Sequence, residues 1–237
     1  SDEKHHLLVN IHHIVADGWS IGLLIKELGA FYAHYHSGAE VQLTPLAVQY
    51  GDYASWQREY QQEGLLSGEL EYWQQRLANI PQVHNLPLDK ARPAEQQFAG
   101  RTLVSHLDTG VTAELKAACQ SQGVTLFMYL QAVFAALLHR YSGEHDIVMG
   151  TPVAGRTHQD IEPLIGMFVN TLVLRNDLSD VNSFEELLAQ SKERILEAQD
   201  NQHVPFDMLV DELNPERSLS HSPIFQVLFT LQNNEQV

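Results

Sequence analysis

Three ionisable side chains stand close together near the start of the chain, in the stretch HHIVADGWS (residues 12–20). His12 and His13 end an apolar run, and a helical pattern begins just after Asp17 and Gly18. Histidine titrates near neutral pH, which suits it to general acid–base chemistry. Asp17 could cap the helix with its carboxylate, or it could pair with a distant arginine and hold the turn. The N–H of Gly18 is expected near a helix N-terminus, where negative charge is stabilised. Glycine would also allow backbone conformations closed to other residues and close approach by a ligand.

The run LLVNIHH (residues 7–13) has the pattern of a strand. Side chains alternate faces along a strand, so His13 would share a face with Ile11, and His12 would point the other way. The two rings could not both reach one reacting atom, and we expect one to act on substrate while the other supports the structure. Opposed rings without a clear third ligand also argue against a metal site. We expect Trp19 and Ser20 to serve packing and capping rather than chemistry.

The elements that must position these residues are predicted from periodicity and from turn and cap signals. Strands and helices mix throughout, which predicts an α/β or α+β class. The stretch 81–97 holds three prolines and has no periodicity, and it is the predicted connection between two lobes. The predicted elements are a helix from Ile21 to near Gly38, an aromatic-rich helix within 50–60, a helix over 67–80, a strand over 101–108, a helix ending before Gly123, an apolar helix capped by Thr125, strands over 146–152 and 168–175, a helix over 184–200 with a capping box from Ser183 to Glu186, a short helix over 205–213 and a strand over 224–232.

Composition and charge narrow the classes of partner. The 237 residues are 44% hydrophobic and 19% charged, as in ordinary globular proteins. The net charge of −16 argues against nucleic acid and anionic membrane surfaces as partners. The longest apolar stretch, residues 126–138, is too short for a membrane span. The single cysteine, Cys119, cannot form an internal disulfide, which fits a reducing, cytoplasmic setting. The chain opens at Ser1 directly into a strand pattern, so we expect an excerpt from a longer polypeptide.

HHIVADGWS resembles the active-site signature of condensation domains from nonribosomal peptide synthetases. Further stretches resemble other motifs of that family in the same order, so the resemblance covers almost the whole chain. What is missing is the N-terminal part of the domain and a short C-terminal end. These further stretches are YGDYASWQREY (50–60), GTPVAGR (150–156), IGMFVNTLVLR (165–175), NQHVPFDMLVDEL (201–213) and RSLSHSPIFQVLF (217–229).

The resemblance implies a chloramphenicol-acetyltransferase-like fold, an α+β two-layer sandwich with two lobes around a substrate tunnel. Residues 1–97 would be the C-terminal part of the first lobe, and residues 98–237 most of the second. The proline-bearing stretch falls where the resemblance places the lobe junction.

The resemblance also implies the activity. The family forms an amide bond between an upstream carrier-bound acyl or peptidyl thioester and the amine of a downstream carrier-bound aminoacyl thioester. His13 would be the general base or the hydrogen-bond partner of the amine, and the sequence does not separate these roles. His12 would be structural, Asp17 would pair with Arg156, and Gly18 would offer its N–H to the substrate. Asn170 is either a hydrogen-bonded core group or a tunnel contact.

The resemblance further implies upstream and downstream peptidyl carrier domains and a neighbouring adenylation domain as partners. It implies no bound cofactor and no metal, because the phosphopantetheine arms belong to the carriers. ADGWSIG and GMFVNTLVLR look most like the subtype that joins an L-configured donor to an L-configured acceptor. Two alternatives stay open: a non-catalytic condensation-like docking domain, and a coenzyme A-dependent acyltransferase of the same superfamily. As an isolated fragment, this chain could be inactive.

Overall fold

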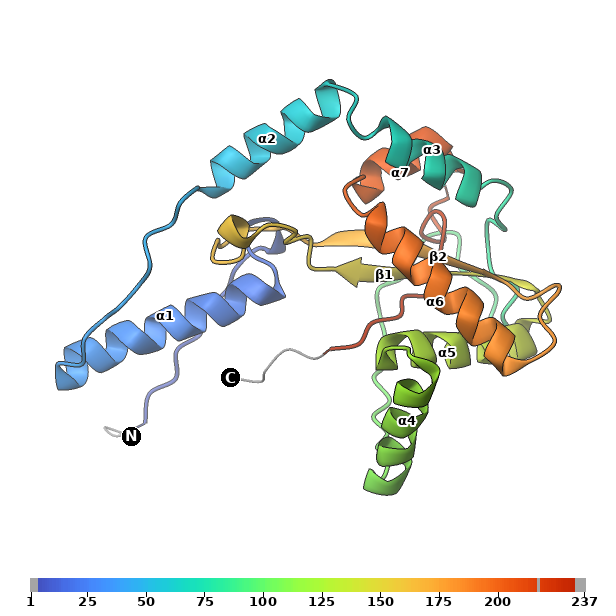
Figure 1. Ribbon diagram of the computed structural model, residues 1–237, viewed down its shortest axis with the longest axis horizontal. Coiled ribbons are helices and arrows are strands. Elements are labelled where there is room, and N and C mark those ends of the chain that lie inside the picture. The colour runs from blue at the N-terminus through green and yellow to red at the C-terminus, as the bar shows by residue number, and fades with distance from the viewer. Residues whose placement is uncertain (1–3, 217, 233–237) are drawn as a thin grey trace. The chain divides into compact units, whose positions relative to one another are not determined.

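A computed structural model describes residues 4–216 and 218–232 (Figure 1). Contacts divide the chain into two compact units: within the described residues, unit 1 comprises 4–65, 154–169 and 232, and unit 2 comprises 66–153 and 170–231. The elements of unit 1 are η1 (His13–Val15), α1 (Gly18–Ser37), α2 (Tyr50–Gln62) and η2 (Gln159–Ile161), and those of unit 2 are α3 (Ser67–Arg76), α4 (Thr109–Gln122), α5 (Leu126–Ser142), β1 (Asp146–Val153), β2 (Asn170–Asp177), α6 (Phe184–Asp200) and α7 (Phe206–Leu213).

Unit 2 is built on an antiparallel pair, β1 and β2, that runs in register from Asp146 opposite Asp177 to Val153 opposite Asn170. Both α5 and α6 cover one face of this pair (Figure 1). Gln131 of α5 contacts Met149 on that face, and Ser191 of α6 donates to Asn176, which the register places on the same side. The arrangement is one helical layer on one sheet layer, which agrees with the predicted α+β two-layer class.

The other face of the pair holds an aromatic contact. The ring of Phe225 lies against Gly150, and a β-carbon at Gly150 would lie 2.3 Å from that ring. Phe206 packs on Phe225 with a centroid distance of 5.4 Å. Glycine is therefore required in the middle of β1 by the close approach of a ring rather than by backbone conformation.

Several predicted caps are present. The side chains of Asp17, Thr125 and Ser183 each accept a hydrogen bond from the backbone N–H three residues later. The capping box at α6 differs in one respect, because the Glu186 carboxylate accepts from the N–H of Asn182 rather than from that of Ser183. Gly38 ends α1 with φ of 73°, a left-handed conformation that favours glycine.

The predicted strands over 7–13, 101–108 and 224–232 are not strands in this structure. Within the described residues, 4–12 and 101–108 belong to no ladder, and the last segment makes only an isolated parallel bridge between Gly150 and Leu228. A strand exists through pairing with a neighbour, and an apolar pattern alone does not supply the neighbour. The 67–80 helix was also predicted too long, because α3 ends at Arg76.

The predicted lobe junction near residue 97 lies inside unit 2. The units follow from contacts within this chain, whereas the lobes refer to a complete domain. The division into 1–97 and 98–237 therefore stays a prediction. In the described part of the chain, no single helix has the length and apolar character to cross a membrane, and only the pair α4–α5, bent by 102°, meets these criteria jointly.

Candidate active site

The two histidines lie on a tight turn. His13 begins the 3-10 helix η1, and His12 caps it: the His12 Nδ1 accepts from the N–H of Ile14 at 3.1 Å. The N–H of Val15 donates to the His12 carbonyl at 3.1 Å, and that of Ala16 to the His13 carbonyl at 3.4 Å. Because these residues form a turn and not a strand, the prediction that strand alternation points His12 and His13 to opposite faces is wrong. The His13 ring is exposed and makes no hydrogen bond within residues 4–216 and 218–232.

Asp17 anchors the end of this turn. Its side chain is fully buried and accepts from the Ser20 N–H at 2.8 Å, the Ser20 hydroxyl at 2.7 Å and the Phe168 N–H at 3.1 Å. Burial alone would raise the pKa of Asp17, but the hydrogen bonds from Ser20 and Phe168 and the charge of Arg156 outweigh it. The pKa of Asp17 is therefore lowered from its ordinary value of 3.8. A carboxylate that stays ionised and accepts this many hydrogen bonds binds a proton poorly, so Asp17 is suited to holding the turn rather than to acting as a general base.

Arg156 pairs with Asp17, as the resemblance implied. Its Nη2 lies 3.1 Å from Asp17 Oδ1, and its side chain is 2% exposed. Its Nη1 donates to the carbonyls of Ile161, Glu162 and Leu164 at 2.6, 3.2 and 2.8 Å. The guanidinium carbon also lies 4.1 Å from the centroid of the Phe168 ring. One cation thus joins the start of α1 to the 161–164 turn.

Ser20 is the residue that sequence reasoning underrated. It is completely buried, and its hydroxyl lies 2.7 Å from Asp17 Oδ1 and 2.9 Å from the Gly166 carbonyl. The same oxygen accepts from the Gly166 N–H at 3.0 Å and from Arg156 Nη2 at 2.9 Å. One proton and two lone pairs are therefore all in use. The only sequence signal is a serine three residues after a capping aspartate, which by itself indicates no more than a helix start.

The segment 166–168 presses against the turn. The Asp17 N–H donates to the Gly166 carbonyl at 3.0 Å, and the Tyr50 hydroxyl donates to the Met167 carbonyl at 2.9 Å. A β-carbon at Gly166 would lie 2.2 Å from the Tyr50 ring, so no larger residue fits there without movement. Phe168 packs against Tyr50 with a centroid distance of 5.2 Å. The aromatic-rich helix α2 thereby supports the segment that holds the histidine turn.

Gly18 is the first residue of α1 and is exposed. Its φ is not positive, so the backbone at this position does not use the conformational freedom that glycine would allow. A β-carbon here would meet nothing within 4 Å among the residues that the structure describes. As the first helical residue, Gly18 has an N–H without an intrahelical acceptor, at the positive end of the helix dipole. Space and an open donor at this place suit the approach of a ligand.

Asn170 belongs to unit 2, and so do its partners. Its Nδ2 donates to the carbonyls of Gln202 and Val204 at 2.9 and 2.8 Å, and its Oδ1 accepts from the N–H groups of Thr171 and Phe206 at 2.8 and 3.1 Å. The amide uses all four of its hydrogen-bonding positions within the chain. This geometry fits the hydrogen-bonded alternative for Asn170, and a contact with substrate stays a prediction.

In residues 4–216 and 218–232, no group of three His, Cys, Asp or Glu side chains could hold a metal ion. The chemical groups at the turn are thus the exposed imidazoles of His12 and His13, the N–H of Gly18 at a helix start and the buried ion pair of Asp17 and Arg156.

Solved structures share this fold. The X-domain in its complex with OxyB from teicoplanin biosynthesis is 34% identical, with a TM-score of 0.82 over 92% of this chain and 49% of that one. A four-domain nonribosomal peptide synthetase bound to AMP and glycine is 28% identical, with a TM-score of 0.84 over 95% of this chain and 17% of that one. The first condensation domain of the CDA synthetase, 22% identical with a TM-score of 0.71, shares the fold over 93% of this chain and 47% of that one. These similarities confirm the predicted chloramphenicol-acetyltransferase-like class.

A family model described as "Condensation domain" matches residues 1–237, and the chain belongs to this family. One of the linear gramicidin synthase proteins of Brevibacillus parabrevis is 48% identical over 98% of this chain. Malpibaldin synthetase of Mortierella alpina is 45% identical over 99% of this chain. The chain spans only 5% and 4% of the length of these two synthetases. The predicted family is thus confirmed.

Proposed function

We propose that the domain carrying this chain forms an amide bond between two carrier-bound substrates of a nonribosomal peptide synthetase. The observation that carries the proposal is the network of Asp17, Ser20, Arg156 and Gly166. This network holds the turn that carries His12 and His13. Both rings are exposed, but the His12 ring is hydrogen-bonded to the Ile14 N–H, whereas the His13 ring has no hydrogen bond among the described residues. A buried ion pair beneath an exposed histidine is expensive to build and serves to position that histidine.

The reaction transfers one acyl group and moves one proton. The α-amine of the downstream aminoacyl thioester attacks the upstream thioester carbonyl, a C–N bond forms, and the carbonyl oxygen becomes an oxyanion. The C–S bond then breaks, the thiol of the upstream carrier leaves, and the amine proton ends on that sulfur or on solvent. The imidazole of His13 takes this proton, or it accepts a hydrogen bond from the amine without removing the proton. The N–H of Gly18 is the group suited to the oxyanion.

Magnitudes favour positioning over proton abstraction. An α-amine has a pKa near 8, so roughly a tenth of it is already nucleophilic at neutral pH. General base catalysis supplies about 10²–10⁴-fold in rate, whereas holding two reactants in place supplies an effective molarity of about 10⁵ M or more. On this account His12, Asp17 and Arg156 act through the geometry of the turn, and only His13 and Gly18 touch the reacting atoms.

The proposed partners are an upstream and a downstream peptidyl carrier domain and a neighbouring adenylation domain. The phosphopantetheine arms of the carriers deliver both substrates, and the chain itself needs no bound cofactor. The proposed subtype joins an L-configured donor to an L-configured acceptor, and the proposed location is the cytoplasm. Support for these partners is the similarity to peptide synthetases, including a four-domain one.

The experiment loads donor and acceptor carriers and mixes them with the complete domain that contains this chain. We expect His13→Ala to abolish most dipeptide formation. His6→Ala is the matched control, because His6 is another exposed histidine, in the segment that precedes the turn. Undiminished product from His13→Ala, with carriers and folding verified, would refute the role assigned to His13.

A second candidate is a non-catalytic docking domain. The specific observation in its favour is the similarity to the X-domain, which was solved in a complex with OxyB. Against it stands the intact HHIVADGWS stretch with its ion pair in place. Binding of a partner enzyme without turnover on any loaded carrier pair would favour docking over catalysis.

A further inference from the structure

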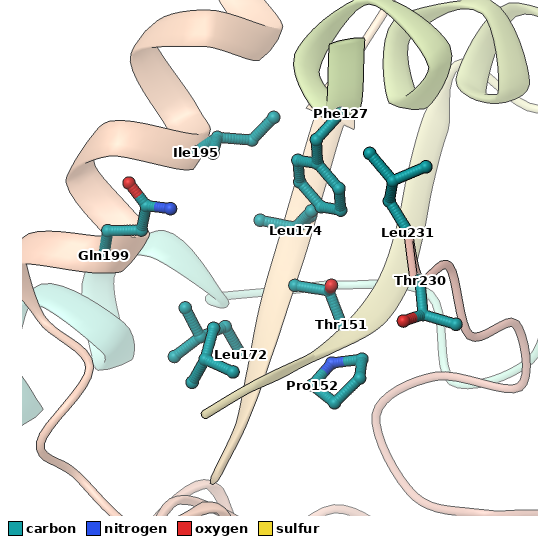
Figure 2. Close-up of a pocket in the computed structure, with 10 residues that line it drawn as sticks. Phe127, Thr151, Pro152, Leu172, Leu174, Ile195, Gln199, Thr230 and Leu231 are labelled. Carbon is teal, nitrogen blue, oxygen red and sulfur yellow. The ribbon is translucent and has the colours of Figure 1, made fainter. Parts of the chain in front are cut away.

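Two cavities of unit 2 differ in the charge of their linings. One, of about 160 Å³, lies on the face of β1 and β2 that α5 and α6 cover, and Leu174 and Ile195 are among its lining residues (Figure 2). None of the residues that line it is charged. The other, of about 230 Å³, is lined by the stretch after α3 and by the chain from the end of α7 onward, and its lining includes Glu216. Only in this second cavity does a fixed charge select a ligand.

The apolar part of the second cavity comes from two stretches of the chain. Leu77 and Ile80 line it from the stretch after α3, and Leu213 and Ile224 line it from the C-terminal part of unit 2. Leu77 and Ile224 are each 3% exposed, so these two side chains belong to the core. Every lining residue lies in unit 2, so one compact unit forms the whole cavity.

The backbone around this cavity adopts conformations that L residues rarely take. Among the described residues, positive φ angles outside glycine occur at Asn79 (57°), Asn214 (41°) and Ile224 (67°). Asn79 and Ile224 line the cavity, and Asn214 lies between two lining residues. Asparagine tolerates the left-handed region, whereas β-branched isoleucine does so only under strain. Ile224 is therefore the outlier that calls for a reason.

Ile224 is the central residue of a γ-turn. The Phe225 N–H donates to the Pro223 carbonyl at 2.8 Å, two residues back in the chain, and φ of Ile224 is 67°. A γ-turn with a positive central φ is rare and strained. Backbone strain persists where the surrounding structure holds it in place, and it is concentrated at ligand-binding sites. The γ-turn is thus an observation, independent of the volume, that marks this cavity as a candidate binding site.

The polar groups of the cavity that lack partners are acceptors. Glu216 is exposed at the rim, and its carboxylate has no hydrogen bond or ion pair with any described residue. The His221 Nδ1 lies 3.1 Å from the Ser222 carbonyl oxygen, which can only accept, so Nδ1 carries the proton of the neutral ring. The Nε2 of that ring is then an acceptor. A carboxylate and an imidazole nitrogen together suit a cationic group that donates hydrogen bonds.

The described chain does not supply this cation. None of the lining residues is lysine or arginine. Arg175 donates from Nη1 to the carbonyl of Ala78, a lining residue, at 2.9 Å. Asp146 balances Arg175, with 2.7 Å between Nη2 and Oδ2, so the charge of Glu216 is left without a counter-ion. The net charge of −16 adds a longer-range attraction for a cationic partner.

We propose that this cavity binds a lysine or arginine side chain of a protein partner. The aliphatic stem lies against Leu77, Ile80 and Ile224. The cationic group lies between the Glu216 carboxylate and the His221 Nε2. Long cationic side chains commonly bury their stems on apolar surface and keep the charged end at the rim. The proposal goes beyond amide formation and does not depend on it, because no substrate is placed here.

The size of the cavity agrees with this occupant. A cavity of about 150 Å³ accommodates benzene, so about 230 Å³ has room for the roughly five to seven heavy atoms of a lysine or arginine side chain. Pockets for whole small-molecule ligands measure about 300–1,000 Å³. The cavity is therefore matched to one anchoring side chain and not to a complete small-molecule ligand.

Two substitutions test the charge. Glu216→Gln removes the charge and keeps the size of the side chain. Glu212→Gln is the matched control, because Glu212 is also exposed, accepts from Gln74 Nε2 at 2.6 Å and does not line the cavity. Both variants remove one negative charge from the same part of the chain, so a difference between them reports contact rather than net charge.

A third substitution fills the cavity. Ala78→Phe adds a ring at an exposed lining position where only the backbone carbonyl holds Arg175, so the fold should tolerate it. Gln75→Phe is its control, because Gln75 is exposed on α3 and does not line the cavity. Thermal unfolding of each variant verifies that it is folded.

The assay is a titration of the complete domain that contains this chain, followed by the methyl NMR signals of Leu77, Ile80 and Ile224. The probes are blocked pentapeptides with lysine, arginine or norleucine between glycines, and n-butylammonium as a free amine. Norleucine keeps an apolar stem and lacks the charge. We expect saturable shifts with a cationic peptide, and an affinity lower by about tenfold or more for the norleucine peptide and in Glu216→Gln. Ala78→Phe should abolish the shifts, and the two control variants should bind as the unmodified domain does.

Several results would overturn the proposal. Absence of shifts with both cationic peptides removes the cavity as a binding site. Equal affinity for the lysine and norleucine peptides, or equal losses in Glu216→Gln and Glu212→Gln, refutes recognition of a cation by Glu216. Binding of n-butylammonium without either cationic peptide replaces the protein partner by a free amine. Failure of dipeptide formation would refute the proposed function alone, because neither the probes nor the variants involve the histidine turn.

Discussion

Replacing Asp17 by asparagine is the most direct perturbation of the buried pair. The carboxylate balances a guanidinium whose side chain is 2% exposed, and its Oδ2 accepts from the Phe168 N–H at 3.1 Å. In Asp17→Asn the charge of Arg156 loses its counter-ion, and if Oδ1 stays toward Ser20, the new NH2 group points at the N–H of Phe168. Both changes leave buried groups unsatisfied.

The expected loss follows from this burial. Breaking one side of a buried ion pair costs about 3–5 kcal/mol, whereas an exposed pair is worth about 0–1 kcal/mol. For a domain of this size, 1 kcal/mol shifts the Tm by about 2–4 °C, so Asp17→Asn should lower the Tm by about 6–20 °C. Asp160→Asn is the matched control, because Asp160 is 53% exposed and pairs with His158, which is 71% exposed.

The assay is thermal unfolding of both single variants, Asp17→Asn and Arg156→Met, and of the double variant. If the two charges are coupled as the structure shows, the double variant is less destabilised than the sum of the single variants. Strict additivity, or a loss in Asp17→Asn no larger than that in Asp160→Asn, would refute the reasoning that the pair holds the turn.

Three further outcomes are expected. Ser20→Ala should lower the free energy of unfolding by about 1–3 kcal/mol in urea titrations, because the Gly166 N–H and Arg156 Nη2 lose their acceptor on Ser20. Ser37→Ala, at the exposed end of the same helix, should change the free energy of unfolding little, and equal effects of the two variants would contradict this. Gly166→Ala should lower the Tm, because its β-carbon would lie 2.2 Å from the ring of the tyrosine that begins α2. Gly18→Ala should leave the Tm unchanged and lower turnover by crowding the substrate. Equal effects of the two variants on Tm and on turnover would contradict this expectation. The folded-state pKa of Asp17 is lowered from 3.8, so its carboxylate contributes stability that is fully present above that value and is lost as the pH falls through the lower folded pKa; the acid limb of stability against pH should flatten in Asp17→Asn, and an unchanged limb would show that another group governs it.

Several helices could be predicted from the sequence because capping residues and terminal glycines mark their ends. Thr125 and Ser183 cap α5 and α6 as predicted, and Gly38 and Gly123 end α1 and α4. A cap, a periodic apolar face and a terminal glycine act within one or two turns of chain, so a window of sequence contains the whole cause. The strands β1 and β2 were also predicted, and they form because the antiparallel partner of each lies in the same chain.

The strand over 7–13 failed for the opposite reason. Its alternation is real, but a ladder needs a partner, and the described chain supplies none; a 3-10 turn begins at His13 instead. The relative orientation of His12 and His13, which the sequence reasoning derived from the strand, failed with it. The importance of Ser20 was equally invisible, since its partner Gly166 stands 146 residues away.

The sequence by itself determined the family, the caps and ends of several helices and the identity of the residues at the histidine turn, because ordered motifs and local propensities depend on neighbouring residues. Only the tertiary structure decided that the Asp17 carboxylate is buried and accepts several hydrogen bonds, and that Ser20 joins α1 to the 154–169 segment. The physical reason is that hydrogen-bond saturation, desolvation and cavity volume depend on atoms brought together from distant parts of the chain, and no local window of sequence contains them.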